Sequence, residues 1–207
     1  MPDLVVLHFT AMRCPERAIA RLSDPEAEVS AHYLIDRQGR VVRLVPESER
    51  AWHAGAGAWG PVRDVNSHSI GVELCNDGQM PFAHAQMNAL QLVLRGIKAR
   101  WSIPAARVIG HSDCAPGRKV DPGPRFDWTR FARLGLAAPT PGGEAEGDLQ
   151  NALARAGYTS NASIEAKLAA LRLRHRPHAS GPADSRDLGI LKGLAGQAAI
   201  DPVPANG

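Results

Sequence analysis

LVVLHF, residues 4–9, places one histidine among five apolar side chains. A short apolar run of this length predicts a buried β-strand. SIGVEL at 69–74 and VIGH at 108–111 are also short and mainly apolar, so they predict two further buried strands. The three segments together predict a sheet whose strands are well separated in the chain.

The remaining pattern supplies a hairpin and helices around these strands. HYLID at 32–36 and RVVRLV at 40–45 flank a short turn containing glycine, which predicts a β-hairpin. Helices are predicted at 15–22, where proline falls in the first turn, at 83–101 and at 126–134. Apolar residues spaced by three and four mark one face of the long helix: Met87, Leu90, Leu94, Ile97 and Trp101. The fold class predicted is α/β, with a central mixed β-sheet flanked by helices.

The composition changes after residue 134. GLAAPTPGGEAEG at 135–147 is rich in Pro, Gly and Ala and has no apolar period, which is typical of a linker. Leucine and isoleucine then recur in three groups, which predict a small three-helix module at 148–198, packed at one side of the sheet. We therefore expect a catalytic domain at 1–134, a linker, this module and a tail at 199–207. About 50 residues form a module that is only marginally stable alone.

Charge and composition exclude several classes of function. The chain has 207 residues, 44% hydrophobic and 22% charged, with a formal net charge of +3. This balance predicts a soluble globular protein and gives little support to nucleic-acid binding. No apolar stretch is long enough to span a membrane. Three cysteines without regular spacing predict free thiols and a cytoplasmic location, with a periplasmic or outer-membrane-associated location as the alternative if a leader was removed.

Three residues far apart in the chain have the chemistry of metal ligands. Catalytic zinc sites use three ligands from His, Cys or carboxylate and keep one position open. His8 lies in an apolar strand, His111 ends another, and Asp121 follows in a loop rich in proline and glycine. They would converge on one ion if the two strands are neighbours. Taken singly, each histidine could be a core residue, and Asp121 before proline could be a turn residue.

Two further charged residues favour catalysis. Glu73 lies in a strand with apolar neighbours, where a carboxylate is costly unless it is paired or functional. Lys119 stands two residues before Asp121, and a lysine there can stabilise the oxyanion of a tetrahedral intermediate. Cys114 is the rival candidate, either as a third ligand or as the nucleophile of a metal-independent peptidase.

Several motifs, in order, resemble the zinc-dependent N-acetylmuramoyl-L-alanine amidases of the AmpD/AmiD type, the amidase-2 family related to peptidoglycan recognition proteins. They are LVVLHFT, SAHYLIDRQGRVVRLVPE, RAWHAG, NSHSIGVEL and GHSDCAPGRKVDPGPRFDW. The resemblance covers about the first two thirds of the chain. The C-terminal helices resemble the peptidoglycan-binding-like module that follows the amidase in AmiD-like members.

The resemblance implies a role for each of the charged residues above. His8, His111 and Asp121 would bind Zn²⁺, Glu73 would be the general base, and Lys119 would stabilise the oxyanion. The bond cleaved would join N-acetylmuramic acid to L-alanine of the stem peptide.

Five further residues are predicted near the substrate. Arg118 could pair with a stem-peptide carboxylate or be solvated at the surface. Trp52 and His53, in a glycine-rich loop, could wall the groove, although Trp52 could equally be core. Tyr33 and His32 are predicted next to the site, with His32 orienting a ligand or the substrate.

The leading functional hypothesis is hydrolysis of anhydro-muropeptides during peptidoglycan recycling. The first alternative is an envelope amidase acting on intact peptidoglycan, which the C-terminal module favours. The second is a peptidoglycan recognition protein without catalysis, which the retained ligand set and Glu73 disfavour. Muropeptide or peptidoglycan is the expected partner, and the sequence predicts no oligomeric state.

Overall fold

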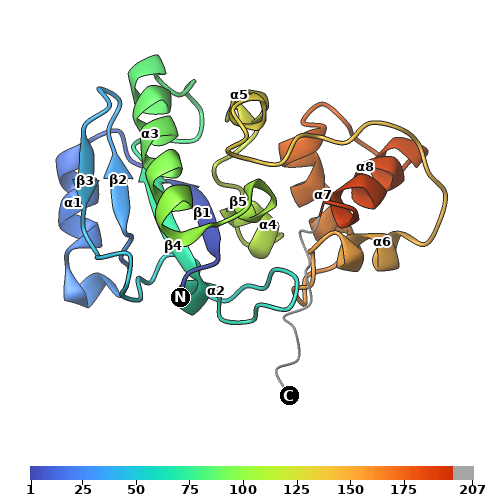
Figure 1. Cartoon of the computed structure of the whole chain (residues 1–207), viewed down its shortest axis with the longest axis horizontal. Helices are drawn as coiled ribbons and strands as arrows, with labels where there is room; N and C mark the ends of the chain where they lie inside the picture. Colours follow the sequence, from blue (N-terminus) through green and yellow to red (C-terminus); the bar gives the residue numbers. More distant parts are fainter. Residues whose placement is uncertain (198–207) are drawn as a thin grey trace.

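The structure is a computed structural model that describes residues 1–197 (Figure 1). One five-stranded sheet forms its centre, in the order β3-β2-β4-β1-β5. All neighbouring pairs are parallel except β2 and β3, which form the predicted hairpin. The strands are β1 (Leu4–Phe9), β2 (Tyr33–Ile35), β3 (Val41–Arg43), β4 (Ser69–Leu74) and β5 (Val108–Gly110).

Eight α-helices and two short 3₁₀ helices lie in the described part of the chain. Before the last strand they are α1 (Pro15–Leu22), η1 (Pro25–Ala27), α2 (Val65–His68), α3 (His84–Trp101) and η2 (Ala105–Arg107). After it come α4 (His111–Cys114), α5 (Trp128–Arg133), α6 (Leu149–Arg155), α7 (Ile164–His175) and α8 (Ser185–Ala195). The short α2 and α4 were not predicted, because four residues are too few to show a period.

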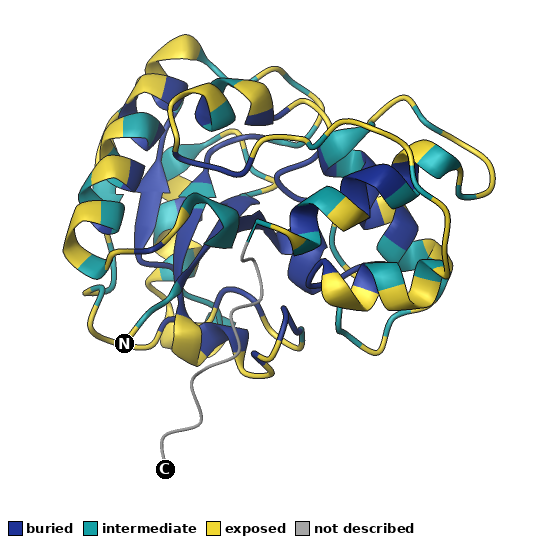
Figure 2. Cartoon of the chain, turned by 45° about the vertical axis from the view of Figure 1, so that its right-hand side comes forward, coloured by how far each residue is buried: buried dark blue, intermediate teal, exposed yellow. Residues whose placement is uncertain are grey.

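The two faces of the sheet have different covers. Side chains alternate between faces along a strand, so Val5 and Leu7 of β1 point to one face and Leu4 and Val6 to the other. Val5 and Leu7 share a core with α3 and α5. Leu4 and Val6 share a second core with α6, α7 and α8. Figure 2 shows the buried strands between helices whose outer surfaces are exposed.

The three C-terminal helices begin at side-chain caps. Asp148, Ser163 and Asp184 each accept a hydrogen bond from a backbone N–H of the first turn, which satisfies donors that have no partner within the helix. The segment 135–147 packs against α8. Gly143 lies close to Gly189, and Pro141 lies close to Gly193.

The predicted fold class is confirmed, and the C-terminal helices lie at one side of the sheet as expected (Figure 1). The predicted tail at 199–207 and the last residue of the module lie outside the described residues. Within residues 1–197, no helix combines the length and the apolarity that crossing a membrane requires.

Candidate active site

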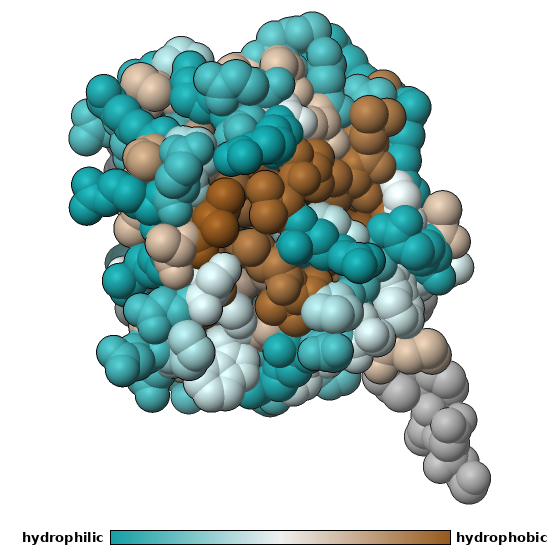
Figure 3. All heavy atoms as spheres, turned by 90° about the vertical axis from the view of Figure 1, so that its left-hand side faces the viewer, coloured by the Kyte–Doolittle hydropathy of each residue, from teal (hydrophilic) through white to brown (hydrophobic). Residues whose placement is uncertain are grey.

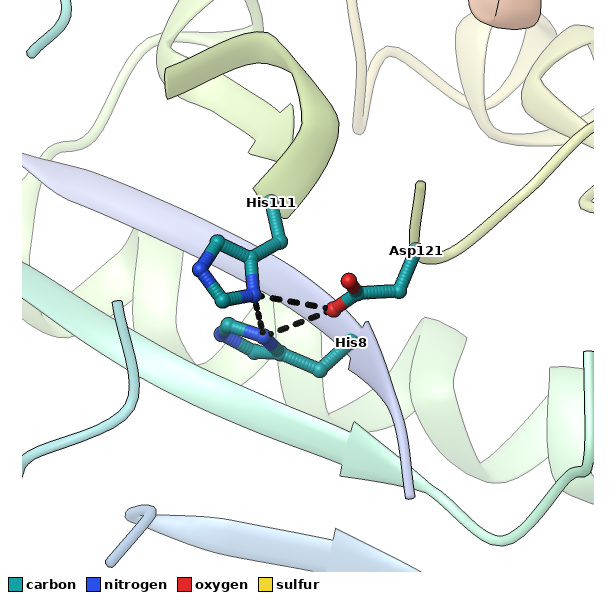
Figure 4. Close-up of side chains that lie close together, drawn as sticks. All are labelled: His8, His111 and Asp121. Carbon is teal, nitrogen blue, oxygen red and sulfur yellow. Dashed lines mark hydrogen bonds and ion pairs between the residues drawn. The ribbon is translucent and has the colours of Figure 1, made fainter. Parts of the chain in front are cut away.

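His8, His111 and Asp121 meet at the carboxyl end of the parallel strands (Figure 4). His8 is near the end of β1, His111 directly follows β5, and Asp121 comes from the loop after α4. The Nδ1 atoms of the two histidines are 2.9 Å apart, and each lies 3.0 Å from Asp121 Oδ2. All three side chains are buried. The adjacency of β1 and β5, which the sequence left open, brings the ligands together.

The Nε2 atom of each of the two histidines has a hydrogen-bond partner, and that partner determines which ring nitrogen carries the proton. His111 Nε2 is 2.9 Å from the carbonyl oxygen of Ala54, which can only accept, so Nε2 carries the proton. His8 Nε2 is 3.0 Å from His53 Nδ1. His53 Nε2 in turn lies 3.3 Å from Ser69 Oγ, whose hydroxyl donates to the carbonyl of Val65 at 2.5 Å.

This chain of hydrogen bonds ends at a carbonyl, so its direction is set. Ser69 donates to the carbonyl, His53 donates to Ser69, and His8 donates to His53 through its Nε2 proton. Both Nδ1 atoms are therefore unprotonated and present lone pairs to the oxygen of Asp121. Burial, followed by the charge of nearby His111, lowers the pKa of His8 to about 4, which also favours the neutral ring.

Three lone-pair donors at these distances repel one another unless a cation lies between them. Two imidazole nitrogens and one carboxylate oxygen form a donor set that suits Zn²⁺ with a fourth position free. The contact behind His111 is the one expected of a metal ligand, since such rings commonly donate their other N–H to a carbonyl or a carboxylate, and the ring of His53 serves as the acceptor for His8. The residues present therefore fit a metal ion.

Glu73 lies beside this cluster on β4. It pairs in register with His8 of the neighbouring parallel strand, so both side chains emerge on the same face. Its Oε2 is buried and has no hydrogen-bond partner among the described residues. Burial, reinforced by the negative charge of Asp121 and opposed by Lys119, raises the pKa of Glu73 to about 8. A carboxyl group held in this way is suited to exchanging a proton with a bound molecule.

A cavity of about 350 Å³ opens over these residues. The predicted metal ligands, Glu73 and Lys119 all line it. Met12 and α1 provide an apolar wall, with Ala18 and Leu22 among its residues. Figure 3, drawn from the side that carries α1 and β3, shows an apolar patch among polar surroundings. The cavity therefore joins a polar floor that holds the candidate metal ligands to an apolar wall.

Trp52 and Arg118 also line the cavity, as the sequence predicted for residues near a substrate. Trp52 is 49% exposed, so its ring is available to a ligand rather than part of the core. The guanidinium of Arg118 donates to the carbonyl of Ala54 at 2.5 Å and also to that of Ala56. Arg118 therefore braces the loop whose Ala54 carbonyl orients His111, besides facing the cavity.

His53 and His32 lie behind the candidate metal ligands. His53 borders the cavity and is 9% exposed, with its ring against Gly71, where a Cβ atom would come within 2.4 Å of the imidazole. His32 is fully buried, accepts from Gly71 N–H at 2.9 Å and lies 3.0 Å from the Glu49 carbonyl. Burial lowers the pKa of both rings. His32 orients neighbouring groups, whereas His53 both contacts His8 and borders the cavity.

Tyr33 points to the opposite face of the sheet. Its neighbour Leu34 pairs with Glu73 in register, so Leu34 shares the face of the site and Tyr33 does not. The hydroxyl of Tyr33 donates to Glu47 at 2.6 Å, and its ring belongs to the core under α3. A contact between Tyr33 and a ligand in the cavity is therefore not expected.

Cys114 is buried beneath the site. It belongs to the core shared with the C-terminal helices, and burial raises the pKa of its thiol well above the ordinary value. It does not line the cavity over the metal-ligand cluster. The structure gives no support to a nucleophilic role.

The Ala54 carbonyl and Ser69 are parts of the site that the sequence did not predict. Every residue has a backbone carbonyl, so the sequence cannot show which one accepts a hydrogen bond. A single serine outside any motif gives no indication of its partner either.

Comparisons relate this chain to known proteins over more than half of its length. The family model for N-acetylmuramoyl-L-alanine amidase matches residues 1–124. AmiD of Escherichia coli is 39% identical over 151 residues, which cover 65% of this chain and 54% of AmiD. AmpD of Enterobacter cloacae is 45% identical over 103 residues, covering 50% of this chain and 55% of AmpD. The chain thus spans about half the length of the curated relatives it matches.

Solved structures match nearly the whole chain. AmiD from E. coli, in complex with anhydro-N-acetylmuramic acid-L-Ala-D-γ-Glu-L-Lys, superposes with a TM-score of 0.86 at 32% identity, covering 97% of this chain and 91% of AmiD. AmpDh3 from Pseudomonas aeruginosa, in complex with anhydromuramic pentapeptide, gives 0.83 at 28% identity, covering 92% and 90%. The chain belongs to the N-acetylmuramoyl-L-alanine amidase family.

Proposed function

We propose that this chain is a zinc amidase that hydrolyses the bond between N-acetylmuramic acid and L-alanine in anhydro-muropeptides. One observation carries the proposal: three unprotonated ligand atoms converge within 3.0 Å beside a buried carboxyl group that has a free oxygen. Family membership supplies the bond that such a site would cleave.

Zn²⁺ would be held by His8, His111 and Asp121. Bound there, it supplies Lewis acidity, which acidifies a water molecule and polarises a carbonyl group. The two Nε2 contacts fix the orientation of both rings before any ion arrives. The energetic cost of ordering the ligands is therefore met by folding rather than by binding.

Glu73 is the proposed proton carrier. Its free oxygen would accept a proton from the attacking water and return it to the leaving amino group, so the carboxylate is regenerated at the end of the cycle. The raised pKa of Glu73 makes the protonated state accessible near neutral pH. Lys119, which lines the same cavity, would stabilise the negative charge on the former carbonyl oxygen.

The substrate assignment is supported by the cavity and by the relatives. AmiD and AmpDh3 were both solved with anhydromuramic peptides. The half-exposed ring of Trp52 offers an apolar face of the kind on which sugars stack, and the remaining donors of Arg118 suit a peptide carboxylate. Soluble anhydro-muropeptides and a role in recycling are therefore the leading proposal, and intact peptidoglycan is the alternative.

A reducing, cytoplasmic compartment is part of this proposal. Cys14, Cys75 and Cys114 are all unpaired in the described residues, and free thiols are typical of such a compartment. Fractionation of the source cells, with detection of the full-length protein, tests this location separately from the activity.

The deciding experiment compares two substrates at equal zinc loading. Zinc-loaded protein is incubated with a defined anhydro-muropeptide and, separately, with purified sacculi, and released peptide is quantified by mass spectrometry. We expect faster release from the soluble substrate, and Glu73→Gln protein as the matched control should release almost none. Faster release from sacculi would favour the envelope alternative. Binding of muropeptide without release by zinc-loaded wild-type protein would overturn the amidase proposal.

A further inference from the structure

Asp113 is a fully buried carboxylate two residues after His111. Its Oδ2 accepts from the backbone N–H of Gly110 at 2.8 Å, within the turn that leads from β5 into α4. The other bonds come from far along the chain. The hydroxyl of Tyr158 donates to Oδ1 at 3.0 Å, and Arg174 Nη1 donates to Oδ2 at 3.1 Å. One carboxylate thus ties the turn that carries His111 to the C-terminal helices.

Arg174 extends from α7 into the catalytic part of the molecule. Besides Asp113, its Nη1 donates to the carbonyl of Val108 in β5 at 3.2 Å. Its guanidinium carbon lies 4.1 Å from the centre of the Trp128 ring, a distance at which a cation is attracted to the ring face. These partners all precede residue 135. The side chain of Arg174 therefore acts within the catalytic part, although its backbone belongs to the module.

Tyr158 makes a second connection on the same side. Its ring packs edge-on against Trp59 with 5.1 Å between centroids, and the carbonyl of Gly157 accepts from Gly60 N–H at 2.9 Å. Trp59 and Gly60 lie in the same connection between β3 and α2 as Ala54, whose carbonyl accepts a hydrogen bond from His111 Nε2. The C-terminal module, through Arg174 of α7 and through Gly157 and Tyr158 of the loop before it, thus contacts both segments that orient this histidine.

We propose that Tyr158 and Arg174 are positioning residues for His111, so that the C-terminal module is a structural part of the metal site. This inference rests on the zinc site of the proposed function. Asp113 is buried and contacts the guanidinium of Arg174, and such a group keeps its place only while its partners remain. Without Arg174, the carboxylate of Asp113 would have to shift towards solvent or admit a water molecule. The turn at Gly110, which is hydrogen-bonded to Asp113, would shift with it and would displace His111, the next residue.

Arg172 provides a matched control on the same helix. It is buried to a similar degree, 7% exposed against 9% for Arg174. Its ion pair, however, joins Asp187 of α8 at 2.6 Å, and its other bonds go to the carbonyls of Gly181 and Pro182. Removing Arg172 disturbs the module without touching the turn of His111. The two arginines therefore separate loss of stability from loss of ligand position.

The experiment measures zinc affinity of the full-length chain by competition with a chromophoric chelator. Arg174→Met, Tyr158→Phe and Arg172→Met are compared with wild type at a temperature where circular dichroism shows each to be folded. We expect Arg174→Met to weaken zinc binding about 10- to 100-fold, the range found when groups that orient a ligand are changed. Tyr158→Phe keeps the ring, and we expect a smaller loss of several-fold. Arg172→Met should lower Tm and leave zinc affinity within twofold of wild type.

Two results would overturn the inference. One is wild-type zinc affinity in both Arg174→Met and Tyr158→Phe; the other is an equal loss in Arg172→Met, which would show a general effect of module stability. Because Tyr158→Phe removes a single hydroxyl, it keeps the test open if Arg174→Met fails to fold. Zinc binding without peptide release by wild type would refute the proposed amidase activity and leave this inference standing, so the two failures are distinguishable.

Discussion

His8 and Glu73 occupy paired positions on adjacent parallel strands, so the proposed metal ligand and the proposed proton carrier lie side by side on one sheet. Both strands are buried along nearly their whole length. The separation between ligand and base is therefore set by strand pairing, which resists small rearrangements. We therefore expect that Glu73 can be substituted without displacing His8, and His8 without displacing Glu73.

Replacing Glu73 by glutamine should abolish turnover while leaving zinc bound. The amide would keep the size of the side chain but could not accept the proton of the attacking water. We expect kcat to fall by about 10²- to 10⁴-fold, the usual contribution of a general base. Peptide release and zinc content, measured on the same preparation, check this. Loss of zinc from Glu73→Gln protein would show that the carboxylate is a ligand instead.

The same substitution should raise the stability of the metal-free protein at high pH. The folded state holds a proton on Glu73 up to a pKa of about 8, whereas the unfolded chain releases it near the ordinary value of 4.5. The stabilisation from this proton is full below pH 4.5 and is lost as the pH rises towards 8, by at most about 1.4 kcal/mol per pH unit. Glutamine does not titrate. In thermal melts with chelator present, the Tm of wild type should therefore fall relative to that of Glu73→Gln protein as the pH rises from 4.5 to about 8. An unchanged difference in Tm over this range would contradict the raised pKa assigned to Glu73.

Removing a ligand should release the metal. His8→Ala and Asp121→Ala each leave two donors for an ion that needs at least three from the protein. We expect zinc affinity to fall by more than about 10²-fold, and the Tm gained on adding zinc to disappear, because metal binding stabilises only the folded site. His68→Ala is the control, since that side chain is half exposed and lies outside the cluster. Equal zinc-dependent shifts in Tm for His8→Ala and His68→Ala would reject the assigned ligand.

Cys114→Ala should retain activity. The thiol is buried in the core shared with the C-terminal helices, away from the cavity over the cluster. Its removal leaves a small cavity, so we expect a loss of stability of about 1 kcal/mol and kcat/KM within twofold of wild type. Chelation of zinc should instead abolish peptide release in both proteins. Release that survives chelation and requires Cys114 would revive the cysteine-peptidase hypothesis.

Much of this site follows from local sequence, and the rest depends on register. Apolar neighbours correctly predicted the buried strands that carry His8 and Glu73. They could not show which residue of HYLID faces the site, because the parity of β2 is set by its pairing with β4. Tyr33, predicted beside the site, therefore lies on the other face of the sheet. The bonds from Tyr158 and Arg174 to Asp113 cross 45 and 61 residues, a separation that no local pattern records.

The segment 135–147 shows the same limit in another form. Its composition predicts a linker, yet small residues also allow close packing. A Cβ atom at Gly189 would lie 2.3 Å from the carbonyl oxygen of Gly143, and one at Gly193 would lie 2.3 Å from Pro141. The segment lies against α8 because two glycines make room for it. Absence of an apolar period excluded regular structure here but did not exclude close packing against a helix.

Gly71→Ala should weaken metal binding without changing any ligand. The glycine lies on β4 beneath the ring of His53, and an added Cβ would come within 2.4 Å of the imidazole. A contact under 3.0 Å forces the ring to move. His53 Nδ1 accepts a hydrogen bond from His8 Nε2–H. Displacement of the His53 ring therefore leaves His8 free to rotate or to change tautomer. We expect zinc affinity to fall about 10- to 100-fold, with a smaller change in peptide release at saturating zinc.

Gly142→Ala is the matched control for this substitution, because a Cβ there meets nothing within 4 Å. Its zinc affinity, measured by the same chelator competition, should equal that of wild type. If Gly71→Ala binds zinc as tightly as Gly142→Ala, the hydrogen bond from His8 to His53 does not orient the ligand, and the direction of the hydrogen bonds that end at the Val65 carbonyl would need to be reassigned. If His53→Ala, which leaves the space open, weakens binding as Gly71→Ala does, loss of the acceptor rather than crowding is the cause.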